Sequence, residues 1–535
     1  MIRTEINSDL IRPIILDHTS YKIKEAVKKM IKGLRSVRIF QNSQVRKLIF
    51  LKILKNLKIG GAVGLPTWKH PKTIKSFQGY PPRNNLQVSC LLSTLRRFQC
   101  MHDFESVLNF SYIQVLWPRN ERKLAKLLHF PNKRMKVIRN LMLPSKLPSF
   151  LLQIACLNHL RFLGLWLHLA EDDNNSRIIF EKFCFSTTRL VSLEQTRLKL
   201  NLLTSNGNKF LEELLPLIRK IAHLHSLHLT QQSENQPLPL LNSPNLDQLR
   251  GFTSFFVKGN ELKEFVLNFS DAFEYSILTM LRVSELRELE SFEFQLGVAP
   301  DFNDSHLSGL LFELNQCRNL RKVVFKFEKS SFLTDDAVKQ ICYALSEMTN
   351  LYAFHLVLGN VYHGSDGLPN LPVYQRFTSR SVEHLTSFLR SYKYQLKELS
   401  VGFCLEDFND GLFESLLDSI AGTSTLKFLQ IYLFKAKITN SAFTHLKNCI
   451  TNLLGLRTVD LALKLCLNIT NELIMNLCEL LTVRNLCRSL TQVKLNLEGT
   501  HVTHKALEDF TFLMRYHKPS TSFHYFLSSS SYSYL

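Results

Sequence analysis

Residues 426–433 read Leu426-Lys-Phe-Leu429-Gln-Ile431-Tyr-Leu433, and this stretch carries the pattern that decides the fold. A leucine opens the pattern, and apolar residues follow three and five positions later; in this stretch Leu433 continues the alternation by one more step. The same arrangement returns in Leu490-Thr-Gln-Val493-Lys-Leu495-Asn-Leu497. Because side chains alternate between the two faces of a strand, every second residue being apolar predicts a short β-strand with one buried face.

A leucine opens this pattern eleven times, and the openings lie 27 to 45 residues apart. They are Leu160, Leu193, Leu224, Leu262, Leu289, Leu320, Leu351, Leu396, Leu426, Leu456 and Leu490. Only the copy at Leu193 is imperfect, because Thr196 takes its second apolar position. A period of this size is typical of a solenoid, in which each unit buries its apolar face against its neighbours.

A second motif follows the first and keeps step with it. It joins an apolar residue to Thr or Asn and then to a third, mostly polar residue, at Phe302-Asn-Asp, Leu333-Thr-Asp, Phe377-Thr-Ser, Phe408-Asn-Asp, Ile438-Thr-Asn, Ile469-Thr-Asn and Val502-Thr-His. Short side-chain oxygens at these positions accept hydrogen bonds from free backbone amides, so they predict helix N-termini. One repeat is therefore expected to contain a strand, a loop, a capped helix and a return loop.

The two motifs together resemble the leucine-rich repeat family, in its ribonuclease-inhibitor-like or cysteine-containing class. The resemblance covers about residues 155–512. The Asn or Cys that usually closes the strand segment is mostly missing, and Phe and Val often replace Leu. The resemblance implies an α/β solenoid shaped as a horseshoe, with parallel strands on the concave face and helices on the convex face.

The first 150 residues differ from the rest of the chain in charge. They hold 29 Lys/Arg and 7 Asp/Glu, which leaves 37 and 38 for all the residues that follow. Leu34, Val37 and Ile39 resemble one copy of the strand pattern, so this region is expected to be either degenerate repeats or a helical cap.

The expected domains are a basic region over 1–150, a repeat array over 151–512 and a Ser/Tyr-rich, frayed tail over 513–535. Glu171–Ser176 is expected to be one of three loop insertions within the array.

Between Glu25 and Asp103 this region has no acidic residue. A basic stretch of this kind suits RNA, an anionic surface or an acidic protein, and it can equally be a solvated face. Aromatic residues, Trp68 among them, are interleaved with the basic ones and could stack on bases. The candidate polyanion-binding residues are Lys52, Lys55, Lys58, Arg96 and Arg97.

The sequence contains few signals of disulfides, membrane segments, metal sites or catalytic motifs. The eleven cysteines are scattered and form no CxxC pair, so reduced thiols in a cytoplasmic or nuclear protein are expected. Neither a secretory signal nor a transmembrane run is recognisable. Because no metal-ligand spacing, phosphate loop or nucleophile motif occurs, we expect no enzyme, no cofactor and no metal. His223, His225 and His228 cluster in one repeat, but alternation along a strand would separate them.

The residues between the apolar positions of each strand should point to the concave face. Candidates for binding a protein partner there are Phe162, Trp166, Arg197, His228, Glu293, His355, Phe428, Gln430, Tyr432, Asp460 and Lys494. Two pairs of aromatic residues stand out, Phe162 with Trp166 and Phe428 with Tyr432, because exposed aromatic side chains are common anchors of interfaces.

Three functions remain open from the sequence. The first is a non-enzymatic scaffold or adaptor that binds a protein partner on its concave face. The second is a substrate receptor of a ubiquitin ligase, a role known among relatives in the resembled class that carry an F-box; Leu147-Pro148 is only a faint echo of that module. The third is a nucleic-acid-associated factor that uses the basic first third.

Overall fold

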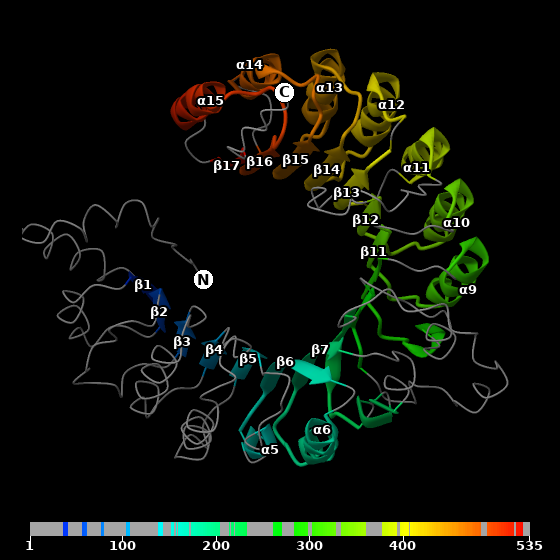
Figure 1. The fold of residues 1–535 in the computed structure, drawn as a ribbon, viewed down its shortest axis with the longest axis vertical. Helices are drawn as coiled ribbons and strands as arrows, with labels where there is room; N and C mark the ends of the chain where they lie inside the picture. The colour runs from blue at the N-terminus through cyan, green and yellow to red at the C-terminus, as the bar shows by residue number, and fades with distance from the viewer. Residues whose placement is uncertain are drawn as a thin grey trace, which may run out of the picture. The chain divides into compact units, whose positions relative to one another are not determined.

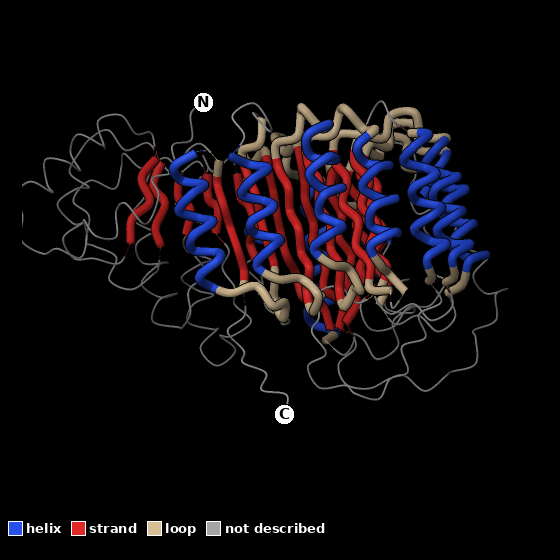
Figure 2. The backbone as a smooth tube through the Cα atoms, turned by 90° about the horizontal axis from the view of Figure 1, so that it is seen from above, coloured by secondary structure: helices blue, strands red, loops and turns tan. Residues whose placement is uncertain are grey.

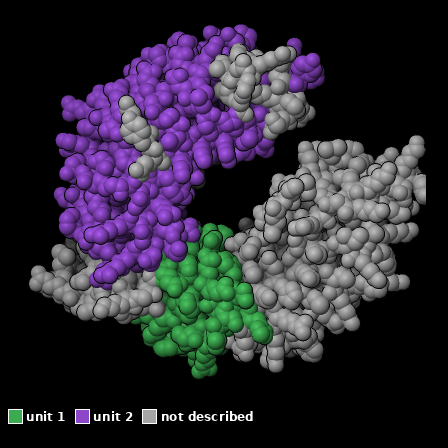
Figure 3. Space-filling view, turned by 180° about the vertical axis from the view of Figure 1, so that it is seen from behind, with its two compact units in different colours: residues 1–230, 260–262 green, residues 231–259, 263–535 purple. Residues whose placement is uncertain are grey.

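A computed structural model describes part of the chain and divides it into two compact units. Unit 1 comprises residues 1–230 and 260–262, and unit 2 comprises residues 231–259 and 263–535 (Figure 3). The described residues are 36–40, 56–60, 76–79, 103–106, 137–142, 151–154, 157, 159–170, 173–203, 213–214, 216–218, 220–232, 261–269, 283–297, 302–327, 333–359, 377–392, 396–405, 407–482, 489–517 and 521–527.

Unit 1 contains a row of strands that pair in parallel. The strands are β1 (Ser36–Phe40), β2 (Asn56–Gly60), β3 (Ser76–Gly79), β4 (Asp103–Ser106), β5 (Val137–Met142), β6 (Phe162–Ala170), β7 (Gln195–Leu203) and β8 (Leu224–Gln232). Each of β1 to β6 pairs in parallel with the strand that follows it in sequence. The helices described here are α5 (Leu151–Ile154) and α6 (Asn174–Thr187).

Unit 2 repeats the same arrangement more regularly. Its strands are β9 (Glu264–Phe269), β10 (Ser291–Leu296), β11 (Lys322–Phe327), β12 (Ala353–Leu358), β13 (Glu398–Phe403), β14 (Phe428–Phe434), β15 (Thr458–Lys464), β16 (Gln492–Asn496) and β17 (Ser522–Phe526). Every neighbouring pair from β9 to β17 is parallel and in phase with the repeat, so that Leu429 lies opposite Val459 and Ile431 opposite Leu461.

The helices of unit 2 form a second layer on one side of the strands. They are α9 (Asp304–Asn315), α10 (Asp335–Ser346), α11 (Ser379–Ser391), α12 (Asp410–Ala421), α13 (Phe443–Asn452), α14 (Asn471–Thr482) and α15 (His504–His517). Figure 1 shows these helices along the outer side of the strand row, and Figure 2 shows strands and helices running along similar directions. The predicted fold class is confirmed: the protein is an α/β repeat solenoid with an open, parallel sheet and helices alternating between the strands. Within the described residues no helix is both long and apolar enough to cross a membrane.

Burial confirms the repeat pattern. All eleven opening leucines are buried, with at most 6% of their surface exposed. The strand residues that we expected to face inward from β14, β15 and β16 are buried as well: Leu429, Ile431, Val459, Leu461, Val493 and Leu495. Each repeat therefore contributes the same positions to the core of its unit, and a single repeat could not bury its apolar face alone.

Phenylalanine replaces leucine in the first strands of unit 2 because the rings pack on one another from strand to strand. Phe292 lies between Phe265 and Phe325, at ring-centroid distances of 6.1 and 6.4 Å and in edge-to-face geometry. Phe294 makes the equivalent contact with Phe327 at 6.2 Å. Edge-to-face contacts are the arrangement that aromatic quadrupoles favour, so a larger residue fills the repeat without disturbing its spacing.

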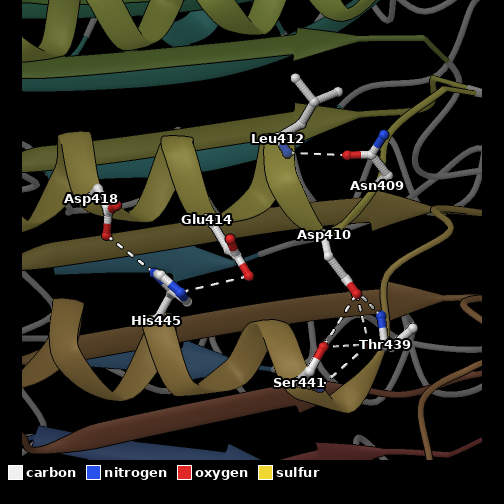
Figure 4. Close-up of polar contacts among 8 residues, drawn as sticks. All are labelled: Asn409, Asp410, Leu412, Glu414, Asp418, Thr439, Ser441 and His445. Atoms are coloured by element: carbon white, nitrogen blue, oxygen red, sulfur yellow. Dashed lines mark hydrogen bonds and ion pairs between the residues drawn. The ribbon is translucent and has the colours of Figure 1, made fainter.

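The second motif also forms the structure that it predicts. Asn303, Thr334, Thr378 and Asn409 cap the N-termini of α9, α10, α11 and α12 through their side-chain oxygens. Figure 4 shows one of these caps, in which the Leu412 backbone amide donates to Asn409 Oδ1 at 3.2 Å. The preceding apolar residues, such as Phe302 and Phe408, are buried and anchor the start of each helix against the core.

Several elements differ from the sequence expectations. Within the expected insertion Glu171–Ser176, the described residues 173–176 form the start of a helix: Asp173 caps α6 and accepts a hydrogen bond from the Ser176 backbone amide at 3.1 Å. A short 3-10 helix, Val283–Glu285, is described between β9 and β10, and it is an element that the strand and helix motifs did not predict. At the C-terminal end the array extends beyond residue 512, because α15 continues to His517 and β17 pairs in parallel with β16.

The described part of the first 150 residues consists of strands. β1 contains Val37 and Ile39 of the copy of the strand pattern that the sequence suggested, and β1 pairs in parallel with β2. Lys58 lies in β2, opposite Arg38 of β1. The other candidate polyanion-binding residues, Lys52, Lys55, Arg96 and Arg97, lie outside the described residues. The assignment of residues 1–150 to a separate domain stays a prediction.

Candidate functional site

The candidate binding residues all lie in strands, at positions that alternate with the core residues. Four belong to unit 1: Phe162, Trp166, Arg197 and His228. The other seven belong to unit 2: Glu293, His355, Phe428, Gln430, Tyr432, Asp460 and Lys494. The candidates therefore form two groups. We call the sheet side opposite the helices the strand face of each unit.

The unit 2 strand face carries a hydrogen-bonded row along the middle position of successive strands. Ser400, Gln430, Asp460 and Lys494 occupy equivalent positions on β13, β14, β15 and β16. Ser400 Oγ donates to Gln430 Oε1 at 2.8 Å, and Gln430 Nε2 donates to Asp460 Oδ2 at 2.9 Å. The Lys494 ammonium lies 3.8 Å from the same carboxylate oxygen. The row fixes the Gln430 amide, because both ends of that amide have a partner.

The formal charges on this face are largely paired within the protein. Lys326 and Glu293 form an ion pair at 2.6 Å, and three-quarters of each side chain is buried. Lys464 of β15 pairs with Glu498 at 2.9 Å. Asp460, at 9% exposure, is compensated by Gln430 and Lys494. A partner that docks between these pairs meets little net charge.

His355 lies among these groups and is uncharged. Burial, with the positive charges of Lys322 and Lys326, lowers the pKa of His355 to about 3. Its ring stacks on Phe428 at a centroid distance of 6.4 Å. His355 Nε2 is buried and, within the described part of the chain, has no hydrogen-bond partner. A buried polar atom without a partner costs about 1–3 kcal/mol, so this nitrogen marks a place where a ligand group would be stabilised.

The fifth residues of β12, β13 and β14 lie opposite one another and are Val357, Gly402 and Tyr432. A Cβ atom at Gly402 would lie 3.3 Å from both methyl carbons of Val357 and 3.4 Å from Tyr432 Cβ. Glycine therefore lets the flanking side chains approach one another. Val357 and Phe434 form a small buried cluster, against which Tyr432 and Cys404 pack. Four half-buried residues lie on the strand face beside this cluster, and we call them the neutral patch: His355, Phe428, Gln430 and Tyr432.

The strand face of unit 1 has a different character. Gly164 and Trp166 of β6 lie opposite Arg197 and Lys199 of β7. The Arg197 guanidinium lies 5.5 Å from the centre of the Phe162 ring, and the Lys199 ammonium lies 5.6 Å from that of Trp166. Both basic residues are exposed. The face thus presents cations that rest on aromatic rings.

A third ring extends this arrangement. His168 stacks on Trp166 at 6.2 Å with an interplanar angle of 14°. Burial lowers the pKa of His168. Trp166 Nε1 and His168 Nε2 are both buried without a hydrogen-bond partner among the described residues. His168 is not among the residues predicted from the sequence, although the alternation along β6 places it on the same face as Trp166.

The histidine cluster near β8 forms contacts with one carboxylate. His223 Nδ1 and His225 Nε2 lie 3.6 and 3.4 Å from the Glu261 carboxylate. Within the described ranges no group of three or more His, Cys, Asp or Glu residues gathers as a metal site would require. The two imidazoles therefore share one carboxylate as a polar contact at the start of β8.

The described cysteines are free thiols. They are Cys184, Cys317, Cys342, Cys404, Cys449, Cys466 and Cys478. Burial raises the pKa of Cys317, Cys342, Cys449 and Cys466 to about 12, so these thiols stay protonated. Protonated, buried thiols are poor nucleophiles and act here as packing residues.

Comparison with known proteins assigns this chain to no group: no family model matches it, and no curated protein matches its sequence.

Proposed function

We propose that this chain is a leucine-rich-repeat scaffold, without enzymatic activity, that binds another protein on the strand face of unit 2. The observation that carries the proposal is the neutral patch, whose residues combine two aromatic rings, an uncharged histidine and an amide held in place by its neighbours. The repeat spacing, the parallel strands and the capped helices support assignment to the leucine-rich repeat class.

The charges and rings of the neutral patch favour one kind of partner segment. The ion pairs Lys326–Glu293 and Lys464–Glu498 lie within the protein and leave few charges to attract a charged ligand. Aromatic rings supply contact area at a low cost in side-chain entropy and are frequent anchors of interfaces. We therefore expect a largely uncharged, apolar segment of a partner protein, with one polar group placed to bond to His355 Nε2.

Affinity capture with cross-linking tests the proposal. Full-length protein is compared with Tyr432→Ala and with Tyr343→Ala, a matched control in which an exposed tyrosine of α10 is removed from the helix side. We expect Tyr432→Ala to deplete a defined set of cross-linked proteins that Tyr343→Ala retains. Loss of the same set in both variants, or in neither, would reject binding at the neutral patch.

Two further functions stay predictions. The sequence echo of a ubiquitin-ligase receptor, Leu147-Pro148, lies outside the described residues. Binding of RNA or an anionic surface by residues 1–150 depends on the excess of basic residues there and on Lys52, Lys55, Lys58, Arg96 and Arg97. Of these five, only Lys58 falls in a described element, β2.

A further inference from the structure

We infer that the strand face of unit 1 is a second binding surface, which takes an acidic segment of a protein partner. This inference goes beyond the proposed function, because it concerns another unit, other residues and a partner segment of opposite character. The surface, called here the cationic face, consists of Phe162, Trp166, His168, Arg197 and Lys199.

The strands around these cations carry no carboxylates. The sequences of β5, β6, β7 and β8 contain no Asp or Glu, yet they include Arg139, Arg197 and Lys199. On the unit 2 strand face, by contrast, Lys326, Lys464 and Lys494 each lie within 4 Å of a carboxylate oxygen. Arg197 and Lys199 rest on aromatic rings instead, which holds them in place without neutralising them.

Two ring nitrogens of the cationic face, Trp166 Nε1 and His168 Nε2, are buried without a hydrogen-bond partner among the described residues. The Trp166 indole nitrogen can only donate a hydrogen bond, and it has no acceptor among the described residues. Arg and Lys side chains are also donors only. A group of neighbouring donors calls for a ligand rich in oxygen acceptors and negative charge, and carboxylates meet both requirements.

The aromatic rings of the cationic face suit an acidic peptide better than a nucleic acid. Proteins that bind single strands use aromatic rings with a free face, on which bases stack. Here one face of Phe162 already carries Arg197, and the Trp166 ring contacts both Lys199 and His168. The rings position the cations and are poorly placed to hold bases.

The spacing also suits an extended peptide. Arg197 and Lys199 are two residues apart on β7, so they point to the same side and their Cα atoms are about 6.7 Å apart. Acidic residues at alternate positions of an extended peptide repeat at the same interval. A sequence that alternates Glu with a small polar residue would therefore place successive carboxylates against both cations.

The experiment uses the full-length protein and a fluorescently labelled peptide of alternating Glu and Ser. Arg197→Gln combined with Lys199→Gln should weaken binding roughly tenfold, since two partly screened ion pairs are lost. Lys220→Gln is the matched control, because Lys220 also lies over an aromatic ring, Phe185 at 4.0 Å, but outside the cationic face. It should change binding less than about twofold.

Trp166→Phe keeps a ring at the site but removes the indole N–H, and it should weaken peptide binding several-fold. The chain has three tryptophans, so a peptide-induced change in intrinsic fluorescence that disappears in Trp166→Phe would locate the ligand at this residue. A peptide of alternating Gln and Ser should not bind, and added salt should weaken binding of the Glu peptide.

Three results would overturn the inference. They are unchanged binding in the Arg197/Lys199 double variant, an equal loss in Lys220→Gln, and an oligouridine that binds more tightly than the peptide through Arg197 and Lys199. Circular dichroism melting of each variant shows whether it keeps its fold. Because Tyr432→Ala leaves unit 1 intact, failure of this inference and failure of the proposed function are separate outcomes.

Discussion

Asp410 of one repeat holds Thr439 of the next: its carboxylate accepts a hydrogen bond from the Thr439 backbone amide and another from the Thr439 hydroxyl, both at 2.7 Å (Figure 4). Asp410 is the first residue of α12, and Thr439 caps the short helical turn that precedes α13. One carboxylate therefore connects the starts of two consecutive helices.

The same connection recurs along unit 2. Asp304 accepts from Thr334, and Asp335 accepts from Thr378 in the same way, through the backbone amide and the hydroxyl. Later repeats use asparagine: the Thr470 amide donates to Asn440 Oδ1 at 3.2 Å, and the Thr503 amide donates to Asn471 Oδ1 at 2.8 Å. These contacts form a polar ladder on one edge of the solenoid, in addition to the apolar core.

The first prediction tests this ladder. Asp410→Ala should lower the free energy of unfolding by about 1–2 kcal/mol, because the Thr439 amide and hydroxyl lose their acceptor. Asp410→Asn should retain most of the stability, since asparagine performs this role at Asn440. Urea denaturation followed by circular dichroism measures the difference.

Asp336→Ala is the control for that prediction. Asp336 also lies in the first turn of a helix, α10, but no ladder bond involves its carboxylate in the described part of the chain. Only its interaction with the helix dipole is lost, which amounts to about 0.3–1 kcal/mol. Equal losses in Asp336→Ala and Asp410→Ala would show that the ladder adds nothing.

The second prediction concerns two glycines with opposite surroundings. Gly499 has φ +70°, and a Cβ atom there would lie only 2.3 Å from Leu465 Cδ2. Gly499→Ala should therefore destabilise the protein by about 1–3 kcal/mol. Gly309 lies inside α9, and a Cβ atom there would meet nothing within 4 Å, so Gly309→Ala should stabilise by about 0.5–1 kcal/mol. Thermal melts of both variants give the signs, and shifts in the same direction would contradict the geometry.

The third prediction concerns how far a core defect spreads. Leu461→Asp buries an unpaired charge at a position with no exposed surface and should cost several kcal/mol, on the order of 3–5. Because repeats contact mainly their neighbours, hydrogen exchange should increase around β14, β15 and β16 and much less in β9 and β10. Thr458→Asp, on the half-buried strand face of the same strand, should have a small effect. A uniform loss of protection along the array would argue against local unfolding.

The fourth prediction follows from His355. Its pKa of about 3 in the folded protein lies below the ordinary value of 6.5, because burial disfavours the charged ring. A depressed folded pKa means that the unfolded chain takes up the proton first. The stability due to the neutral ring is therefore complete above about pH 6.5 and is lost progressively as the pH falls toward 3. His355→Gln should flatten the decline in the urea midpoint between pH 6.5 and 4, and an unchanged slope would show that His355 is not responsible.

The low pKa of His355 also predicts how binding at the neutral patch depends on pH. His355 keeps one charge state across the physiological range, so a partner bound at the neutral patch should bind equally well at pH 6 and pH 8. The cationic face of unit 1 should be sensitive to salt instead, since Arg197 and Lys199 are exposed.

Much of the fold was predictable because it depends on local patterns that repeat. The leucine openings and the Thr or Asn helix starts specify strand, core and cap within short stretches, and the structure has these elements at the expected positions. The expected concave positions also lie on the strand faces, since alternation along a strand is a property of the backbone. The sequence did not predict β17, because Ser522–Phe526 lacks a leucine opening and forms a strand by pairing with β16.

The sequence by itself determined the repeat, its period, the core residues and the caps, because each depends on neighbours only a few positions away. The tertiary structure decided which residues meet across repeats. Gln430 joins Ser400 to Asp460, and Lys199 lies over Trp166, each across at least 30 residues of sequence. The physical reason is register: the loops between strands vary in length, and only the paired strands bring a given cation opposite a carboxylate in one unit and opposite an aromatic ring in the other.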